Sequence, residues 1–174
     1  MELTHEDIQK LHKKVREWKK LEQGDSDSVY RDGPEYEIVN SIDSTTEAIA
    51  VAPIVDGKTD YSKTIVLTAG TQTTFTSGTN AGIQAFVSGL SPQYDEMDEF
   101  FSETQKILEE KGVDGGQIYY SSAHSQAGVP NAKLSVKYRV KEIVNFYDWG
   151  AKKAVDSGVF SSSEMKYLKK HAII

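Results

Sequence analysis

The chain has 174 residues, enough for one domain with a substantial core, and its 26 acidic and 20 basic residues give a net charge of −6. This acidic balance argues against a nucleic-acid partner. The lack of cysteine excludes disulfides and cysteine nucleophiles, and no apolar run approaches the roughly 20 residues of a transmembrane segment.

The first half of the chain predicts one helix followed by strands. Apolar residues recur at helical spacing from Thr4 to Leu21, which indicates an amphipathic helix capped by Thr4 and Asp7. Its apolar stripe favours packing on the body of the protein, and docking on a membrane surface or a partner is the alternative. Strands are expected at 36–42, 48–55 and 64–68, the first two as a hairpin and the third buried on both faces.

The second half alternates between helices and strands. Residues 72–90 form a long polar segment with scattered apolar side chains, which is typical of a functional flap. The expected elements after it are a helix over 91–111, a strand at 117–121, a helix over 125–138, a strand at 142–146, and short helices at 151–157 and 163–171.

This alternation predicts an α/β fold. We expect a mostly parallel sheet with helices on both faces, an antiparallel hairpin at one edge and an N-terminal helix within residues 1–24, all in one domain over 1–174. Ligand sites in such a sheet lie at the carboxyl ends of the strands. The first residues lack the regions of a secretory signal peptide, so the expected location is the cytoplasm, or outside it by another export route.

The segment around Ser125 has the pattern of a nucleophile elbow, a tight turn from a strand into a helix that presents a serine hydroxyl. Alanines stand at 123 and 127, where the usual Gly-x-Ser-x-Gly pattern has glycines. A small flank is needed because the turn brings neighbouring backbone close. The alternative is an ordinary serine at a helix N-cap.

A serine nucleophile also requires donors for the oxyanion that forms during acyl transfer. The backbone N–H of Gln126, at the start of the following helix, is one candidate. Thr71 is the second, because Gly70 lets the backbone after the buried strand come close. The alternative is that Gly70 and Thr71 form only a turn at the end of the strand.

Two of these motifs resemble a known family. Thr-Ala-Gly-Thr-Gln at 68–72 and Ala-His-Ser-Gln-Ala-Gly at 123–128 are similar to the α/β-hydrolase lipases of the fungal-type triacylglycerol lipase branch and their bacterial lipase-like relatives, over about residues 36–150. The resemblance implies a short or truncated hydrolase that acts on carboxylic esters, including lipid esters. Ser125 is then the nucleophile, and Thr71 and Gln126 hold the oxyanion.

The rest of the triad is expected later in the chain. Asp148 follows the next strand and is the candidate carboxylate, and His171 is the histidine that chain order leaves for the base. The alternatives are a helix cap for Asp148 and a solvated charge at a helix C-terminus for His171.

No motif indicates a cofactor or a metal. The acidic run 95–99 suits a solvated helix face, the loop around Asp25 and Asp27 lacks the ligand pattern of a calcium loop, and residues 112–116 lack a phosphate-loop lysine. The expected partner is a small-molecule or lipid ester. The rival hypothesis is a catalytically incomplete lipase-like module that binds a protein or lipid, or a fragment completed by a partner chain.

Overall fold

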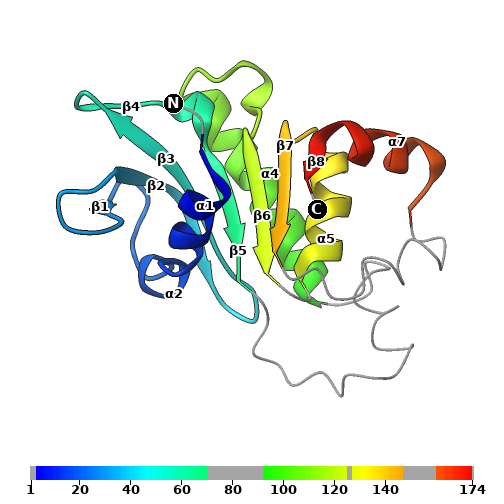
Figure 1. Ribbon diagram of the computed structural model, residues 1–174, viewed down its shortest axis with the longest axis horizontal. Helices are drawn as coiled ribbons and strands as arrows, with labels where there is room; N and C mark the ends of the chain where they lie inside the picture. Colours follow the sequence, from blue (N-terminus) through cyan, green and yellow to red (C-terminus); the bar gives the residue numbers. More distant parts are fainter. Residues whose placement is uncertain (1–2, 70–91, 125–126, 147–159, 174) are drawn as a thin grey trace.

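A computed structural model describes residues 3–69, 92–124, 127–146 and 160–173 (Figure 1). The elements of the first half are α1 (His5–His12), α2 (Val15–Trp18), β1 (Ser26–Ser28), β2 (Glu35–Asp43), β3 (Glu47–Val55), β4 (Lys58–Thr59), the 3-10 turn η1 (Tyr61–Lys63) and β5 (Ile65–Thr68). Those of the second half are α4 (Pro92–Glu110), the 3-10 turn η2 (Asp114–Gly116), β6 (Tyr120–His124), α5 (Gly128–Lys137), β7 (Glu142–Phe146), α7 (Ser162–His171) and β8 (Ala172–Ile173).

One mixed sheet runs through the molecule in the order β1-β2-β3-β5-β6-β7-β8, with β4 paired to β3. The predicted α/β class is confirmed, but the prediction of a mostly parallel sheet is wrong. Among the described strands, the pairs β1–β2, β2–β3, β3–β4 and β3–β5 are antiparallel, and only β5–β6, β6–β7 and β7–β8 are parallel. The first half of the chain was expected to add one antiparallel hairpin to the edge of a parallel sheet. Its short turns instead join several consecutive strands, and short turns permit only antiparallel neighbours.

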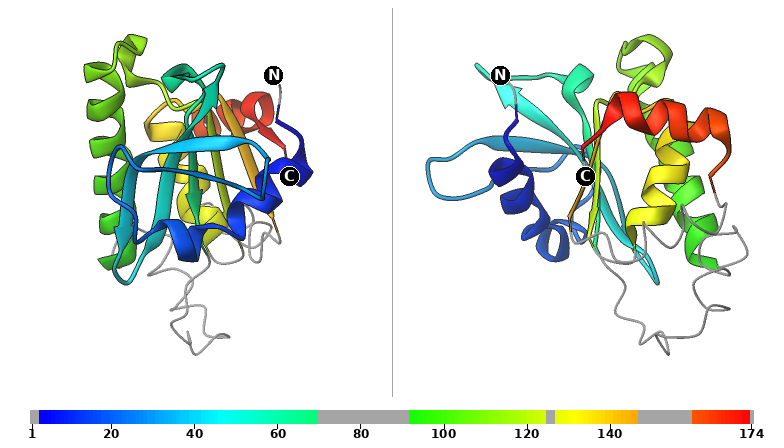
Figure 2. Two further views of the ribbon diagram at one scale, coloured as in Figure 1. Left: turned by 90° about the vertical axis from the view of Figure 1, so that its left-hand side faces the viewer. Right: turned by 45° about the vertical axis from the view of Figure 1, so that its right-hand side comes forward.

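Helices cover both faces of the sheet, as predicted. Figure 2 shows α1 and α2 on one side and α4, α5 and α7 on the other. On the first side, Ile8, Leu11, Val15 and Trp18 bury the apolar stripe of the N-terminal segment against β2, β3 and β5. The predicted packing of this segment on the body of the protein is therefore what the structure shows.

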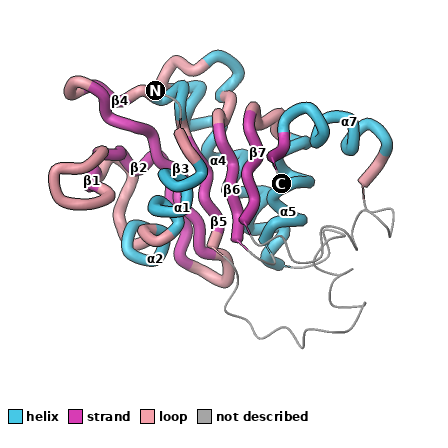
Figure 3. Tube along the Cα trace, viewed as in Figure 1, coloured by secondary structure: helices cyan, strands magenta, loops and turns pink. Residues whose placement is uncertain are grey.

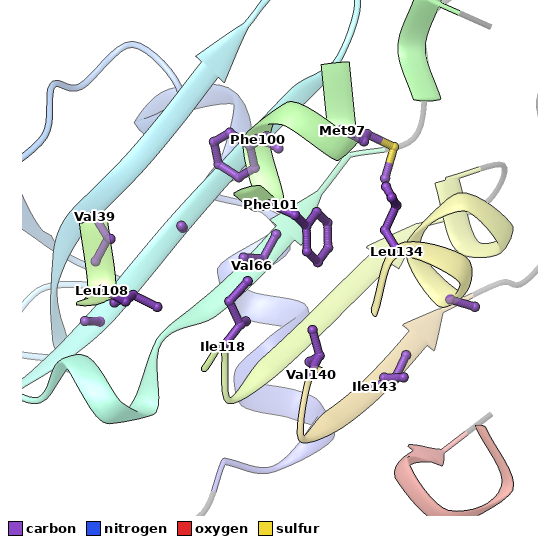
Figure 4. Packing of buried hydrophobic residues seen from close by; sticks show 14 of the residues in the cluster. Val39, Val66, Met97, Phe100, Phe101, Leu108, Ile118, Leu134, Val140 and Ile143 are labelled. Carbon is purple, nitrogen blue, oxygen red and sulfur yellow. The ribbon is translucent and has the colours of Figure 1, made fainter. Parts of the chain in front are cut away.

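The second side holds the larger part of the core. Figure 4 shows Phe101 of α4 between Val66 of β5 and Leu134 of α5, with Ile143 of β7 further along the sheet. Each of these side chains is buried, and together they join α4 and α5 to the parallel strands. This burial holds α4 and α5, the helices that connect the parallel strands, in place. A helix as short as the ten-residue α5 is marginal in water on its own.

The predicted elements that fall on described residues are present, with two larger changes in their bounds. Figure 3 shows where these helices and strands lie. The single helix expected over 4–21 is interrupted at Lys13–Lys14 and becomes α1 and α2. The strand expected at 117–121 lies at 120–124 instead, because η2 takes up the chain before it and Ile118 enters the core outside any strand. The expected flap at 72–90 and the short helix at 151–157 lie outside the described residues.

The turn between β2 and β3, together with the first residue of β3, forms hydrogen bonds to the residues that flank the segment 70–91. The backbone N–H of Ala69, just after β5, donates to the carbonyl oxygen of Glu47 at 2.9 Å. The carboxylate of Glu96, near the start of α4, accepts hydrogen bonds from the Thr46 backbone N–H and the Ser44 hydroxyl, both at 2.9 Å. The end of β5 and the start of α4 are thus fastened to the same turn.

The connection from α4 to β6 depends on a glycine. Gly116 has φ +62°, and a Cβ atom placed there would lie 2.2 Å from the carbonyl oxygen of Gln105. Gly115 also has a positive φ, of +65°, but a Cβ atom there would meet nothing within 4 Å. A side chain at Gly115 would therefore meet only the strain of a left-handed backbone. A side chain at Gly116 would meet the same strain and also a steric clash with the backbone of Gln105.

We expect Gly115→Ala to lower the free energy of unfolding by about 1 kcal/mol, the strain of a left-handed alanine. Gly116→Ala should lower it by about 2 kcal/mol or more, because the clash with Gln105 adds to the same strain. Urea unfolding of the two variants and the parent measures both effects. Equal losses in the two variants would contradict the proposed close approach.

Candidate active site

A short connection joins the central parallel strand β6 to the helix α5. β6 ends at His124, α5 begins at Gly128 with Ala127 as its N-cap residue, and only residues 125–127 connect them. β6 lies between β5 and β7 and is parallel to both. The strand predicted before position 125 and the helix predicted after it are therefore present, while Ser125 and Gln126 lie outside the described residues.

Both small flanks of this turn are buried. Ala123 and Ala127 have no exposed surface, and Gly128 is also buried. On the sheet, Ala123 is in register with Thr68 of β5 and Asn145 of β7. A larger side chain at either alanine would have to displace packed neighbours, which agrees with the steric reason for small residues beside an elbow.

A network of polar side chains fixes α5 to the strands beneath it. The hydroxyls of Ser121 and Ser135 lie 2.6 Å apart, and the Asn131 side-chain amide donates to Asn145 Oδ1 at 2.9 Å. Asn145 in turn donates to the carbonyl oxygen of Gly128, also at 2.9 Å. These bonds join β6, β7 and the first turn of α5, so the helix start after residue 125 has a fixed position.

Among the described residues on this side of the sheet, two buried oxygens have no hydrogen-bond partner: Thr68 Oγ1 and Asn131 Oδ1. Thr68 is the last residue of β5 and is 1% exposed, and Asn131 is fully buried. A buried polar atom without a hydrogen bond lowers the free energy of unfolding by about 1–3 kcal/mol. Its presence therefore indicates a position where a polar group has a role other than stability.

The carboxyl ends of the three parallel strands β5, β6 and β7 lie together. Thr68, Ala123 and Asn145 are in register across β5, β6 and β7, so these strands end at one edge of the sheet. Four of the predicted site residues follow these ends along the chain. They are Thr71, Ser125, Gln126 and Asp148, and all four lie outside the described residues.

His171 is described, and it lies at the other end of the sheet. Its Nδ1 is 2.8 Å from the carbonyl oxygen of Lys141, the residue before β7, and its ring stacks on Tyr167 with the centroids 4.1 Å apart. β7 separates this position from the strand ends by five residues, about 13 Å of rise. The structure does not bring His171 to His124, the residue next to Ser125.

A different histidine does reach the end of β6. His12, the last residue of α1, places its Nε2 2.7 Å from Ser122 Oγ. Its ring also meets the ring of His124 edge to face, with the centroids 4.2 Å apart and the planes at 82°. Ser122 and His124 are two residues apart on β6 and therefore share one face of the sheet, the face that α1 covers.

The sequence indicates that His12 faces the sheet, although it does not indicate its partner. His12 is four residues after Ile8 and next to Leu11, so it lies on the buried stripe of the N-terminal helix. Sequence order alone had favoured His171, because the family resemblance places the histidine late in the chain. The site prediction did not consider a histidine on the apolar face of a helix.

Both histidines of this pair are neutral at neutral pH. Burial, together with the nearby His124, lowers the pKa of His12 from 6.5 to about 3. Burial also lowers the pKa of His124. Two cationic rings in contact would repel each other, so protonation of both rings at once is disfavoured.

Two surface hollows lined by described residues lie away from this pair. One is lined by α4 and α5 and contains Asp98, whose carboxylate binds Lys137 and Tyr138. The other is lined by η1 and the end of α4, beside Tyr61 and Lys111. Neither brings a nucleophile and a histidine together.

Within the described ranges, no group of three or more histidine and acidic side chains is arranged to hold a metal ion. No helix in the same ranges is long and apolar enough to cross a membrane. Comparisons with protein-family models, with curated proteins and with solved structures find no match for this chain.

The pKa of His12 makes stability depend on pH. The unfolded ring titrates near 6.5 and the folded ring near 3, so between these values the unfolded chain binds a proton that the folded chain does not. Lowering the pH from 6.5 towards 3 should therefore reduce the free energy of unfolding by up to about 1.4 kcal/mol per pH unit through this residue.

Urea unfolding of the parent and of His12→Gln across this pH range measures the effect as a difference, which removes the contribution of the other ionisable groups. His5→Gln, at an exposed position of the same helix, is the matched control for the substitution itself. Parallel pH curves for the parent and His12→Gln would contradict the lowered pKa.

Proposed function

We propose that this protein is a serine hydrolase of the lipase-like α/β-hydrolase type, which acts on carboxylic esters with Ser125 as the nucleophile. The observation that carries the proposal is the short connection between β6 and α5, which lies at the convergent ends of three parallel strands and has buried alanines on both flanks. A serine in such a connection between a strand and a helix is what an elbow nucleophile needs.

The proposed reaction is acyl transfer. Ser125 Oγ attacks the ester carbonyl carbon, and the negative charge that develops on the carbonyl oxygen is held by the backbone N–H groups of Thr71 and Gln126. Gln126 stands two residues before α5, and α5 is a ten-residue helix whose N-terminus favours negative charge. Asp148, beyond the end of β7, is the proposed carboxylate of the site.

The proposed substrate class includes lipid esters. Residues 72–90 combine a polar composition with apolar residues such as Phe75, Phe86 and Val87, and they follow β5 at the same edge of the sheet as the elbow. Apolar side chains in a segment that follows this edge would suit an acyl chain. A comparison of short and long acyl esters as substrates tests this part of the proposal.

A second candidate function is a catalytically incomplete module that binds a protein or lipid, or a fragment completed by a partner chain. The position of His171 favours it, because the histidine that chain order assigns to the triad lies beside Lys141 at the far end of β7. An activity-based probe separates the two candidates.

We expect a fluorophosphonate probe to label the folded protein at one serine, because such probes report an activated hydroxyl. Ser125→Ala should abolish the labelling. Ser163→Ala, at an exposed position in α7, should leave it unchanged, and in-gel fluorescence with peptide mass spectrometry identifies the modified residue. A folded protein that the probe does not label would favour the binding module.

A further inference from the structure

We propose that the protein has a second binding site, which takes a phosphate group, at the edge of the sheet where the parallel strands begin. Lys63 and Lys141, both held at the ring of Tyr119, bind the phosphate oxygens. The amino ends of β5, β6 and β7 lie along the upper edge of the sheet in Figure 1, opposite the strand ends described above. The site is therefore independent of the proposed hydrolase.

Backbone hydrogen bonds bring three separate segments together at this edge. The carbonyl oxygen of Thr64, just before β5, accepts a hydrogen bond from the backbone N–H of Tyr119 at 3.0 Å. The backbone N–H of Lys141, just before β7, donates to the carbonyl oxygen of Ile118 at 3.2 Å. Lys63, Tyr119 and Lys141 are neighbours because the strands that follow them are paired, so binding requires little further ordering of the backbone.

The two lysines share one aromatic ring. Nζ of Lys63 lies 3.9 Å from the centroid of the Tyr119 ring, and Nζ of Lys141 lies 4.8 Å from it. The two ammonium groups are therefore within about 9 Å of each other. Cation–π attraction holds each of them at the ring, but the like charges repel each other, and an anion bound by both would remove that repulsion.

Neither ammonium group has a carboxylate partner within the described part of the chain. The ion pairs found there involve other lysines. Asp60, the acidic residue nearest to Lys63 along the chain, has its carboxylate bonded to the backbone N–H and the hydroxyl of Ser62. Glu142 follows Lys141 directly and forms no ion pair with it in the same ranges. The described residues therefore leave the charge of both lysines to be neutralised by a ligand.

A third cation at this edge stands at a position that favours glycine. Arg139 follows α5 with φ +57°, and the backbone N–H of Val140 donates to the carbonyl oxygen of Ser135 at 2.9 Å, as in a Schellman cap. Arginine is strained in this left-handed conformation, whereas glycine is not. The guanidinium lies 5.7 Å from the centroid of Tyr167, two positions before Lys141 along the chain. We infer that Arg139 adds positive charge to the site at some cost in stability.

The charge and spacing of the lysines favour a phosphate group over a carboxylate. Two separate ammonium groups are best bound by an anion with more than one charge and with oxygens on more than one side. A phosphate monoester carries about two negative charges near pH 7 and three such oxygens. The net charge of −6 for the whole chain opposes a long polyanion, but it does not prevent a small one from binding at this local pair.

Binding of inorganic pyrophosphate to the full chain, measured by isothermal titration calorimetry, tests the proposal. We expect Lys63→Gln and Lys141→Gln to weaken binding about tenfold each, because each removes one charged contact. Tyr119→Phe keeps the ring at both lysines and should bind as the parent does. Lys20→Gln, at an exposed position just after α2, is the matched control and should also bind as the parent does.

Arg139→Gly separates binding from stability. Glycine relieves the backbone strain, so the Tm of this variant should equal or exceed that of the parent. Its affinity for pyrophosphate should still fall several-fold, because a positive charge beside the ligand is lost. An unchanged affinity would overturn the role of Arg139 in the site.

Thermal unfolding checks that each variant is folded. A folded parent that does not bind pyrophosphate at about 10 mM overturns the proposal. Equal weakening in Lys20→Gln and in the two site variants also overturns it, because the attraction would then be a general effect of charge. Unchanged affinity in both Lys63→Gln and Lys141→Gln overturns it as well.

Sedimentation with phosphatidylcholine vesicles that contain phosphatidic acid distinguishes two sources of the phosphate group. Vesicle binding that pyrophosphate displaces and Lys63→Gln weakens would support a lipid headgroup as the ligand. Pyrophosphate binding without vesicle binding would support a soluble phosphate ester. Vesicle binding that neither pyrophosphate nor the lysine variants change would overturn a lipid role for this site.

Discussion

Residues Ile65–Thr68 are almost completely buried because α1 and α2 cover one face of the sheet and α4 and α5 cover the other. This two-sided burial fixes the direction and register of β5, and β6 and β7 then add to it in parallel. The three strands therefore end together at one edge, so any chemistry in the segments after them has a common location. The hydrophobic effect on the two faces, rather than any polar contact, sets that edge.

The N-terminal helix has two roles in this arrangement. Its apolar stripe closes one core, and its last residue, His12, carries a ring nitrogen to the hydroxyl of Ser122 in the middle of β6. Burial of the apolar stripe offsets the cost of holding a neutral histidine away from water, because each fully buried apolar side chain contributes about 1.5–3 kcal/mol to the free energy of unfolding. The position of His12 therefore depends on Ile8, Leu11 and the packing of the same turn.

The parts of the fold that local pattern specifies were predictable from the sequence. The strand at 142–146, the buried strand before Ala69 and the helix after Pro92 were expected within a residue or two. The short strands β1, β4 and β8 were not, because two or three residues carry no periodicity and pair only once the larger sheet exists. The contact between His12 and Ser122 spans 110 positions and arises from how α1 crosses the sheet, which no local spacing encodes.

The fastening of Ala69 and Glu96 to one hairpin turn has a consequence for how this chain can vary. Because the framework already holds both ends of the segment between them, each doubling of that segment's length costs only about 0.6 kcal/mol of closure entropy. Insertions there would leave the two cores untouched. Changes confined to that one stretch of chain can therefore accumulate while the sheet is inherited intact.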